Sequence, residues 1–336
     1  LTFGERSSYR LDDIGELEVG IKKVSYEGTL NDLYDNDRNR FVEYNINDVL
    51  ILQELDSKLD FIDIARAICH LGHVPYEDVY YSSRFLEGAI LVYLKKVGIV
   101  APNKVKANRQ LMDGNDKFTG AYVQDPQKGK HEWVYDLDIT SMYPSIIMSL
   151  NISPETKLGK LDSWDVEPFL KGVDKTYTIN NKYGKETAKL TTSEFKNFLN
   201  DNNVSVSSNG VLYTQDRRGL IPTLLEKWFD DRVQFRKLAK KFAEQGDKDK
   251  YAYFDRRQYI QKVVLNSLYG VLGLPVFRFY DLDNAEATTT TGVELIKYTK
   301  RMANHYYNST LGDKDDYCIY IDTDSVFYSA IPIIEK

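Results

Sequence analysis

Apolar residues in the N-terminal part of the chain recur at the spacing of a helix. Between residues 41 and 70 they return close to every 3.6 positions, which predicts a helical segment with one apolar face. A second helical stretch is predicted at about residues 83–97. Residues 101–130 are rich in Pro, Gly, Asn and Lys and are typical of a connecting segment. The apolar positions of the first segment are Phe41, Tyr44, Val49, Leu52, Leu55, Leu59 and Ile62.

The middle of the chain begins with a short strand candidate. It covers residues 131–137 and is closed by Asp138. Pro144 follows where a helix can begin, because the missing N–H of proline costs nothing in a first helical turn. Residues 155–215 are polar and contain several turn signals. They predict an insertion with short strands and one short helix near 192–200.

Two long helices are predicted at about 222–244 and 250–271. Residues 245–249 (QGDKD) separate them, which is the pattern of an αα-hairpin. Arg232 and Lys262 lie equally far from this turn, about 20 Å from the tip at the rise of an α-helix. Arg236 and Asn266 lie one turn away from them on the same faces. Four polar groups can therefore converge on one place.

The C-terminal part is predicted to alternate between strands and a helix. Residues 274–281 have a strand-like pattern, and a helix is predicted from about 284 to 308. The two β-rich runs 317–321 and 326–328 flank the polar residues 322–325 (DTDS). This arrangement indicates a β-hairpin.

The charge of the chain is unevenly distributed. The 336 residues carry a net charge of −6, which alone argues mildly against nucleic acid as a partner. Residues 230–262, however, hold ten Lys and Arg against six acids, a local charge of +4. A basic element on an acidic body suits a protein that binds phosphates in one place and cations in another. The alternative is a solvated helical hairpin of mixed charge.

The remaining bulk properties favour a globular protein from a reducing compartment. Hydrophobic residues make up 42% of the chain, and no apolar run approaches the ~20 residues that a membrane span needs. Cys69 and Cys318 are far apart, which argues against a disulfide framework or a cysteine-based zinc site. The chain begins at Leu1 without a secretory signal, so we expect a piece of something longer that functions in the cytoplasm.

Three aspartates are candidate metal-binding or catalytic residues. Asp138 ends a predicted strand, and Asp322 and Asp324 lie on the turn of the predicted hairpin. Carboxylates at strand ends can share two Mg²⁺ ions, and such a pair supports phosphoryl transfer. The ordinary alternative for Asp-x-Asp is a simple Asx-type turn. The four histidines form no metalloprotease pattern, and no Gly-x-Ser-x-Gly elbow is present.

The combination of three segments resembles the family-B DNA-directed DNA polymerases. Residues 138–146 (DITSMYPSI) are similar to the first polymerase motif, DxxSLYPSI, and residues 262–270 (KVVLNSLYG) to the second, KxxxNSxYG. Residues 320–325 (YIDTDS) are similar to the third, YGDTDS. Met142 replaces a Leu of comparable size. Ile321 replaces a Gly, and would tighten the site if the backbone there must approach primer or metal closely.

The resemblance implies a site for two metal ions. Asp138 and Asp324 would ligate both Mg²⁺ ions, with Asp322 close by and more peripheral. Ile139 would contribute through its backbone. The backbone from Ile139 to Met142, together with Ser141, would receive the triphosphate of the incoming nucleotide.

The resemblance also implies how the nucleotide is selected and held. Tyr143 would stack under the deoxyribose and exclude a 2′-hydroxyl; the alternative for this residue is core packing. Arg232 and Arg236 would hold the phosphates. Lys262 would contact the α-phosphate and could protonate the departing pyrophosphate. The residues lining the nascent base-pair pocket would be Asn266, Tyr269 and Gly270.

Residues 44–48 (YNIND) are similar to a motif of the family's 3′–5′ exonuclease, YxxxD. Tyr44 would orient the attacking water and Asp48 would be a metal ligand, unless the pattern is only a helix surface. Nothing in residues 1–43 resembles the expected Asp-x-Glu strand, so we expect a remnant without proofreading. Residues 120–123 (GAYV) resemble the linker motif between exonuclease and polymerase. Residues 151–156 (NISPET) look closest to the tailed-phage replicative branch.

These expectations combine into an α/β (α+β) protein with an antiparallel-sheet palm and inserted helical-hairpin fingers. The C-terminal end of a ribonuclease-H-like exonuclease domain would precede it. The expected domains are an exonuclease remnant, a connecting segment, the first part of the palm, the fingers and the second part of the palm, without a thumb. Their expected limits are 1–75, 76–130, 131–221, 222–272 and 273–336.

The expected function is template-directed DNA synthesis from dNTPs on primer–template DNA, with two Mg²⁺ ions. Expected partners include a sliding clamp and a second chain or flanking segments, with no membrane. One alternative is the non-catalytic half of a split polymerase, which binds DNA and needs a second chain. Others are a polymerase that copies or makes RNA, against which Tyr143 argues, and a purely structural role.

Overall fold

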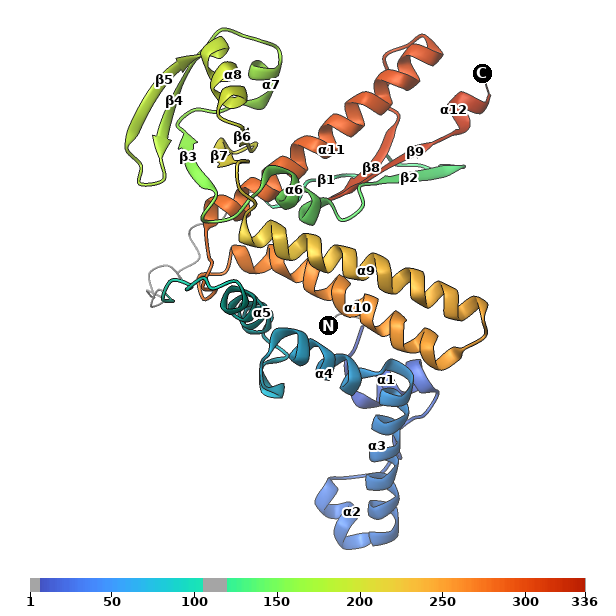
Figure 1. Ribbon diagram of the computed structural model, residues 1–336. Coiled ribbons are helices and arrows are strands. Elements are labelled where there is room, and N and C mark those ends of the chain that lie inside the picture. Colours follow the sequence, from blue (N-terminus) through green and yellow to red (C-terminus); the bar gives the residue numbers. More distant parts are fainter. Residues whose placement is uncertain (1–6, 105–119, 336) are drawn as a thin grey trace. The chain divides into compact units, whose positions relative to one another are not determined.

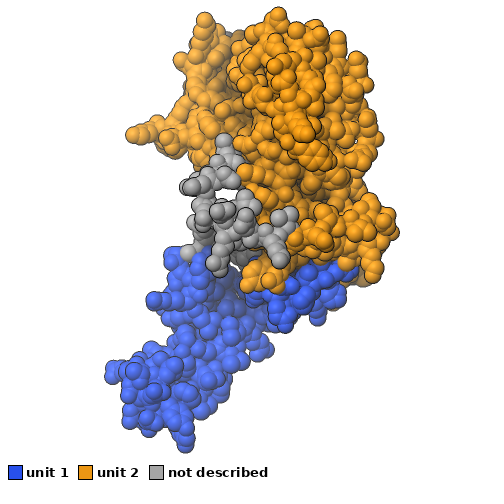
Figure 2. Space-filling view, turned by 90° about the vertical axis from the view of Figure 1, so that its left-hand side faces the viewer, with its two compact units in different colours: residues 1–80 blue, residues 81–336 orange. Residues whose placement is uncertain are grey.

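The computed structural model describes residues 7–104 and 120–335. The chain divides into two compact units, Leu1–Tyr80 and Tyr81–Lys336 (Figure 2). The sequence predicts the end of the exonuclease remnant at residue 75, close to the limit of the first unit. Of the helices in the described ranges, none combines the length and apolar character needed to cross a membrane.

All the regular elements of the first unit within residues 7–80 are helices. The helical segment predicted at 41–70 is confirmed, but it is divided in two at Asp60, whose φ of 56° ends one helix before the next begins. Ile51, Leu55 and Ile68 are among its buried residues. Its elements are α1 (Leu11–Val19), α2 (Leu30–Asn36), α3 (Arg38–Leu59), α4 (Phe61–Gly72) and the 3₁₀ turn η1 (Tyr76–Asp78).

The second unit contains a four-stranded antiparallel sheet that forms the palm. Its strand order is β1 (Val123–Gln124), β8 (Cys318–Asp322), β9 (Ser325–Ser329) and β2 (Val134–Asp138). The predicted hairpin and the strand ending at Asp138 are therefore confirmed. Residues 123–124, which the sequence assigns to a connecting segment, add an edge strand. The long helix α11 (Leu282–Leu311) packs on this sheet (Figure 1).

Ile321 belongs to the core between this sheet and α11. Its side chain is fully buried in a cluster that includes Ile296, Val326 and Tyr328. Side chains alternate between the two faces of a strand, so Ile321 points into the core while Asp322 is exposed. The Ile321 side chain is therefore directed away from the face that carries Asp322.

The predicted helical hairpin is confirmed. Helices α9 (Leu220–Glu244) and α10 (Lys248–Leu272) run antiparallel and contact each other along their length (Figure 1). Gly246 adopts a φ of 72° at the turn, a conformation that favours glycine. Asp247 caps α10 by accepting the N–H of Lys250. Helix α5 (Ser82–Lys96), which agrees with the stretch predicted at 83–97, contacts α10.

The insertion predicted at 155–215 forms a second antiparallel sheet with its own core. Phe169, Tyr177, Phe195 and Leu212 are buried together there. The short helix predicted near 192–200 is confirmed as α8. The order of the strands is β5 (Glu186–Thr191), β4 (Thr176–Asn181), β3 (Lys157–Leu161), β7 (Val211–Thr214) and β6 (Val204–Val206), with helices α7 (Val166–Leu170) and α8 (Thr192–Asp201).

The strand predicted at 274–281 is wrong. This segment forms consecutive turns, in which the Phe277 N–H bonds to the Leu274 carbonyl and the Tyr280 N–H bonds to the Phe277 carbonyl. Phe277 and Phe279 are nevertheless buried. Aromatic residues produced the strand-like pattern, but they fill the core from a turn, and Pro275 cannot donate to a sheet.

Asn151 joins the palm, the insertion and the fingers. It ends α6 (Met142–Leu150), is almost fully buried, and donates to the carbonyls of Thr214 and Arg217 at 2.7 and 2.9 Å. The oxygen of its side-chain amide accepts the Gly219 N–H at 2.8 Å. We expect Asn151→Ala to lower the free energy of unfolding by about 3 kcal/mol, because buried polar groups lose their partners.

Urea unfolding followed by circular dichroism measures this effect. Asn202→Ala is the matched control, because Asn202 is exposed and its side chain donates one hydrogen bond, to the Phe198 carbonyl. If both variants unfold at the same urea concentration, Asn151 does not hold these elements together.

Candidate active site

The three predicted carboxylates lie at one end of the palm sheet. Asp138, the last residue of β2, is paired with Ser325, and Ser325 is also paired with Asp322 across the hairpin. The N–H of Ile139 donates to the Asp324 carbonyl at 2.9 Å, which fixes the turn against the end of β2. Residues far apart in the sequence thus meet at this strand end.

The turn between β8 and β9 is held in an unusual conformation. Thr323 has a φ of 55°, a left-handed conformation that is uncommon for a β-branched residue. Its N–H donates to the Tyr122 carbonyl at 3.0 Å, and its hydroxyl donates to Asp322 at 3.0 Å. Tyr122 comes from the predicted linker motif, so this motif supports the acidic turn directly.

The carboxylates at this strand end repel one another. Burial raises the pKa of Asp324, and the charges of Asp138, then Asp322 and Asp136, raise it further. The Ser325 hydroxyl lies 3.2 Å from a carboxylate oxygen of Asp136 and 3.4 Å from one of Asp138. Asp136 is a fourth acid that the motif comparison missed. Its position two residues before Asp138, on the same face of a strand, was the available signal.

The strand end is suited to a cation in charge and ligand type. Within the described ranges, no Lys, Arg or His forms an ion pair with any of these four acids. A divalent cation would relieve the repulsion that raises the pKa of Asp324, and carboxylate oxygens are ligands that Mg²⁺ prefers. The same residues do not form a closed ligand set, since no group of three or more acids, histidines or cysteines is arranged to hold a metal among the described residues.

The predicted nucleotide-binding segment leads directly into α6. Ser141 has a φ of 51° and forms the N-terminal boundary of this helix. Met142 is buried, with 3% of its surface exposed, so its side chain belongs to the core. Ile139 packs at the edge of the palm core. The Met142 side chain is therefore not available to a ligand, whereas Ile139 is only partly buried.

Tyr143 and Tyr269 join the palm to the fingers. Their rings are stacked, with centroids 4.3 Å apart and an interplanar angle of 29°. Burial raises the pKa of Tyr143 to about 12, and the neighbouring Tyr269 and Asp324 add to the shift. Burial raises the pKa of Tyr269, and the Thr289 side chain of α11 partly offsets this rise. The stacked pair therefore lies beside the acidic strand end.

The predicted phosphate-binding residues occupy α9 and α10 of the fingers. Arg236, Lys262, Asn266 and Gly270 are exposed, whereas Arg232 is partly buried. Burial, and then the charge of Arg236, lower the pKa of Arg232. Its Nε is buried without a hydrogen-bond partner. An unpaired guanidinium donor next to a second arginine is suited to an anion.

The structure does not bring these cations into contact with the acids. No hydrogen bond or ion pair joins Arg232, Arg236 or Lys262 to the acidic strand end in the described part of the chain. Helix α6, which follows the acidic strand end, contacts both α9 and α10, and the Tyr143–Tyr269 stack belongs to this contact.

The comparison with protein families decides the assignment. The model described as DNA polymerase family B matches residues 79–331, which is most of the chain. The chain belongs to DNA polymerase family B. The antiparallel sheets and helices of the chain match the fold of a family B polymerase.

Relatives of this family-B chain include proteins from phages and archaea. A DNA-directed DNA polymerase from Escherichia phage RB69 is 28% identical over the whole chain, and one from Enterobacteria phage T4 is 27% identical over 99% of it. The chain spans 39% of the length of each. A family B DNA polymerase structure from Pyrobaculum calidifontis matches 97% of the chain and 37% of its own, with a TM-score of 0.64 and 25% identity.

The exonuclease-like residues of the first unit are held by a lysine. Lys23 Nζ lies 2.8 Å from an Asp48 carboxylate oxygen and 4.7 Å from the centre of the Tyr44 ring. The hydrogen bonds that the Lys23 ammonium donates to Asp48 and to Tyr44 raise the pKa of Lys23. The other oxygen of Asp48 is buried without a partner. Sequence reasoning missed Lys23, which no local pattern links to the helix of Tyr44 and Asp48.

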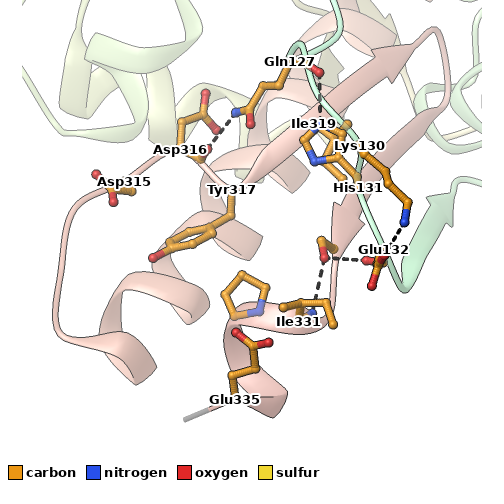
Figure 3. A pocket seen from close by; sticks show the side chains of 12 residues that line it. Gln127, Lys130, His131, Glu132, Asp315, Asp316, Tyr317, Ile319, Ile331 and Glu335 are labelled. Carbon is orange, nitrogen blue, oxygen red and sulfur yellow. Dashed lines mark hydrogen bonds and ion pairs between the residues drawn. The ribbon is translucent and has the colours of Figure 1, made fainter.

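A separate cavity of about 640 Å³ lies at the opposite end of the β8–β9 hairpin (Figure 3). Tyr317 and Ile319 line one side, and Ile331 and Glu335 line another. The Asp322–Ser325 turn takes no part in it. The cavity is therefore not the candidate active site.

Proposed function

We propose that this chain carries the nucleotidyl-transfer centre of a DNA-directed DNA polymerase, which adds dNTPs to a primer 3′-OH on a template. The supporting observation is that Asp138 and Asp324, which come from separate motifs, meet at one strand end. There they lack a basic partner among the described residues, and Asp324 has a raised pKa. Such a set of acids is stabilised by a divalent cation.

Asp138 and Asp324 would hold two Mg²⁺ ions, with Asp322 at the periphery and the Ile139 backbone as a further ligand. When bound, such ions lower the pKa of a hydroxyl and neutralise charge on a leaving pyrophosphate. The protein's part is to hold these oxygens in place, which the pairing of β2 with β9 favours. The Ser325 hydroxyl would orient the Asp138 carboxylate from the side of β9.

The fingers would bind the triphosphate. Arg232 and Arg236 lie one turn apart on α9, so both guanidinium groups can donate to one phosphate chain. Lys262 would approach the α-phosphate as a point charge and protonate the leaving group. Ser141 and the backbone leading into α6 would complete the triphosphate-binding site. Asn266 and Gly270 would face the new base pair.

Tyr143 would select the sugar. Its ring is fixed by the stack on Tyr269, so it provides a rigid floor for a deoxyribose. The 2′-hydroxyl of a ribonucleotide would clash with this ring. We therefore expect dNTPs rather than rNTPs as substrates. Primer–template DNA is the partner that this function requires. A sliding clamp and a cytoplasmic location follow from the resemblance alone.

Primer extension tests the proposal. The chain is incubated with primer–template DNA, Mg²⁺ and either dNTPs or rNTPs, alone and with a thumb-containing family-B segment. We expect Mg²⁺-dependent extension with dNTPs. Extension only with the added segment would indicate one half of a split polymerase, and rNTP incorporation at equal rates would indicate an RNA-synthesising enzyme. DNA binding without extension under both conditions would contradict the proposal.

A further inference from the structure

Gly292 lies within α11 where this helix faces the start of α6. It is buried. A Cβ atom at this position would lie 2.9 Å from Met142 Cε, 3.2 Å from Tyr143 Cε1 and 3.6 Å from Ile146 Cδ1. Carbon atoms in contact normally lie about 3.5–4.0 Å apart. The Tyr143 ring therefore reaches the backbone of α11 only because residue 292 has no side chain.

The other neighbours of the Tyr143 ring leave it little freedom. Its face is stacked on Tyr269, with ring centroids 4.3 Å apart. On its other side, the ring edge faces Gly292 of α11. The Met142 side chain is flexible and can yield to an added methyl group. The Tyr143 ring is rigid, so contact at its edge must shift or tilt the whole ring.

Glycine in the interior of a helix lowers helix stability relative to alanine, so it is expected where a larger side chain does not fit. Alanine would stabilise the middle of α11 through its higher helix propensity. The four residues before Gly292 are all threonine, and two of them, Thr288 and Thr289, are buried. Small side chains thus follow one another along α11, and the smallest lies against the Tyr143 ring.

We infer that Gly292 is a positioning residue for nucleotide selection, which sets the depth at which the Tyr143 ring lies and hence the space left for the deoxyribose. This inference rests on the proposed function, because the depth of the ring matters only if the ring meets the sugar. Displacements of about 1 Å in an active site can cost about 100-fold in rate. A shift of a few tenths of an ångström should have a smaller effect, mainly on substrate binding.

Single-nucleotide primer extension with the Gly292→Ala variant tests this inference. We expect the KM for dNTP to rise about 3- to 10-fold while kcat changes by less than about twofold. The ratio of dNTP to rNTP use should change as well. The Tm should stay the same or rise, since alanine favours the helix. Thr299→Ala, further along α11, is the control, and its KM should equal that of the unaltered chain.

A double-mutant cycle separates Tyr143 from general packing. In a Tyr143→Ala background, Gly292→Ala should change the dNTP KM by less than about twofold, because the ring that the methyl displaces is gone. An equal effect in both backgrounds would overturn the inference. So would an unchanged KM in the single variant, or a fall in Tm with kcat and KM both impaired. Failure of the unaltered chain to extend primers, with the added segment present, would instead overturn the proposed function and the inference with it.

Discussion

Asp324→Asn is expected to reduce Mg²⁺-dependent primer extension by about 1,000-fold or more, because it removes one of the two carboxylates proposed to hold both metal ions. Asp138→Asn should have a similar effect. Both aspartates lie at the same strand end, where the Asp324 backbone is bonded to Ile139 next to Asp138. Steady-state extension at saturating dNTP and a range of Mg²⁺ concentrations measures the loss.

The stability of the Asp324→Asn variant should not fall with its activity. The pKa of Asp324 is raised in the folded protein, first by burial and then by the neighbouring acids. A raised pKa of an acid means that its charged form is disfavoured by folding, so this contribution weakens the fold as the pH rises above the unfolded pKa. Asparagine removes that charge, and the Tm at pH 7 should be equal or higher.

The matched control is Asp315→Asn. Asp315 is an exposed acid before the other end of β8, in the lining of the separate cavity. Its substitution changes the net charge by the same amount and should leave extension unchanged. Extension that survives in Asp324→Asn at ordinary Mg²⁺ concentrations would remove Asp324 from the metal site. Equal losses in both variants would point to a general effect of charge.

The elements that carry the motifs were predictable because their signals are local. The helices of the fingers follow from two helical stretches separated by the polar residues 245–249, and the β8–β9 hairpin follows from β-rich runs around Asp322–Ser325. Segment 274–281 was predicted wrongly because its aromatic residues are buried from turns rather than from a strand. The spacing of apolar residues indicates which side chains are buried, but it does not determine the backbone conformation that buries them.

The supporting residues were not predictable in the same way. Lys23, Gly292 and Thr289 act through contacts with segments distant in the sequence, and nothing in their immediate surroundings marks them. Asp136 is the exception, since the alternation of a strand places it beside Asp138. The burial of Ile321 likewise follows from that alternation once the strand is known. Tertiary packing, rather than local propensity, determines these positions.

Arg232→Ala is expected to raise the KM for dNTP by about 10- to 100-fold with a smaller change in kcat. Arg232 is partly buried beside Arg236, and its Nε has no hydrogen-bond partner. Hydrogen bonds to charged groups contribute roughly 1.5–3 kcal/mol, which corresponds to this change in affinity. Arg232→Lys should fall between the two, because lysine keeps the charge but cannot donate two parallel hydrogen bonds.

The unfolding measurement gives this prediction its sharpest test, because stability and substrate affinity should change in opposite directions. The buried donor and its positive neighbour disfavour Arg232 in the chain without nucleotide, so Arg232→Ala should leave the Tm unchanged or raise it. Lys237→Ala, at an exposed site on a different face of α9, should alter neither quantity. A loss of Tm together with an unchanged KM would mean that Arg232 stabilises the fingers and does not bind phosphate. Loss of dNTP affinity at constant or higher Tm is the result that only a ligand-binding role explains.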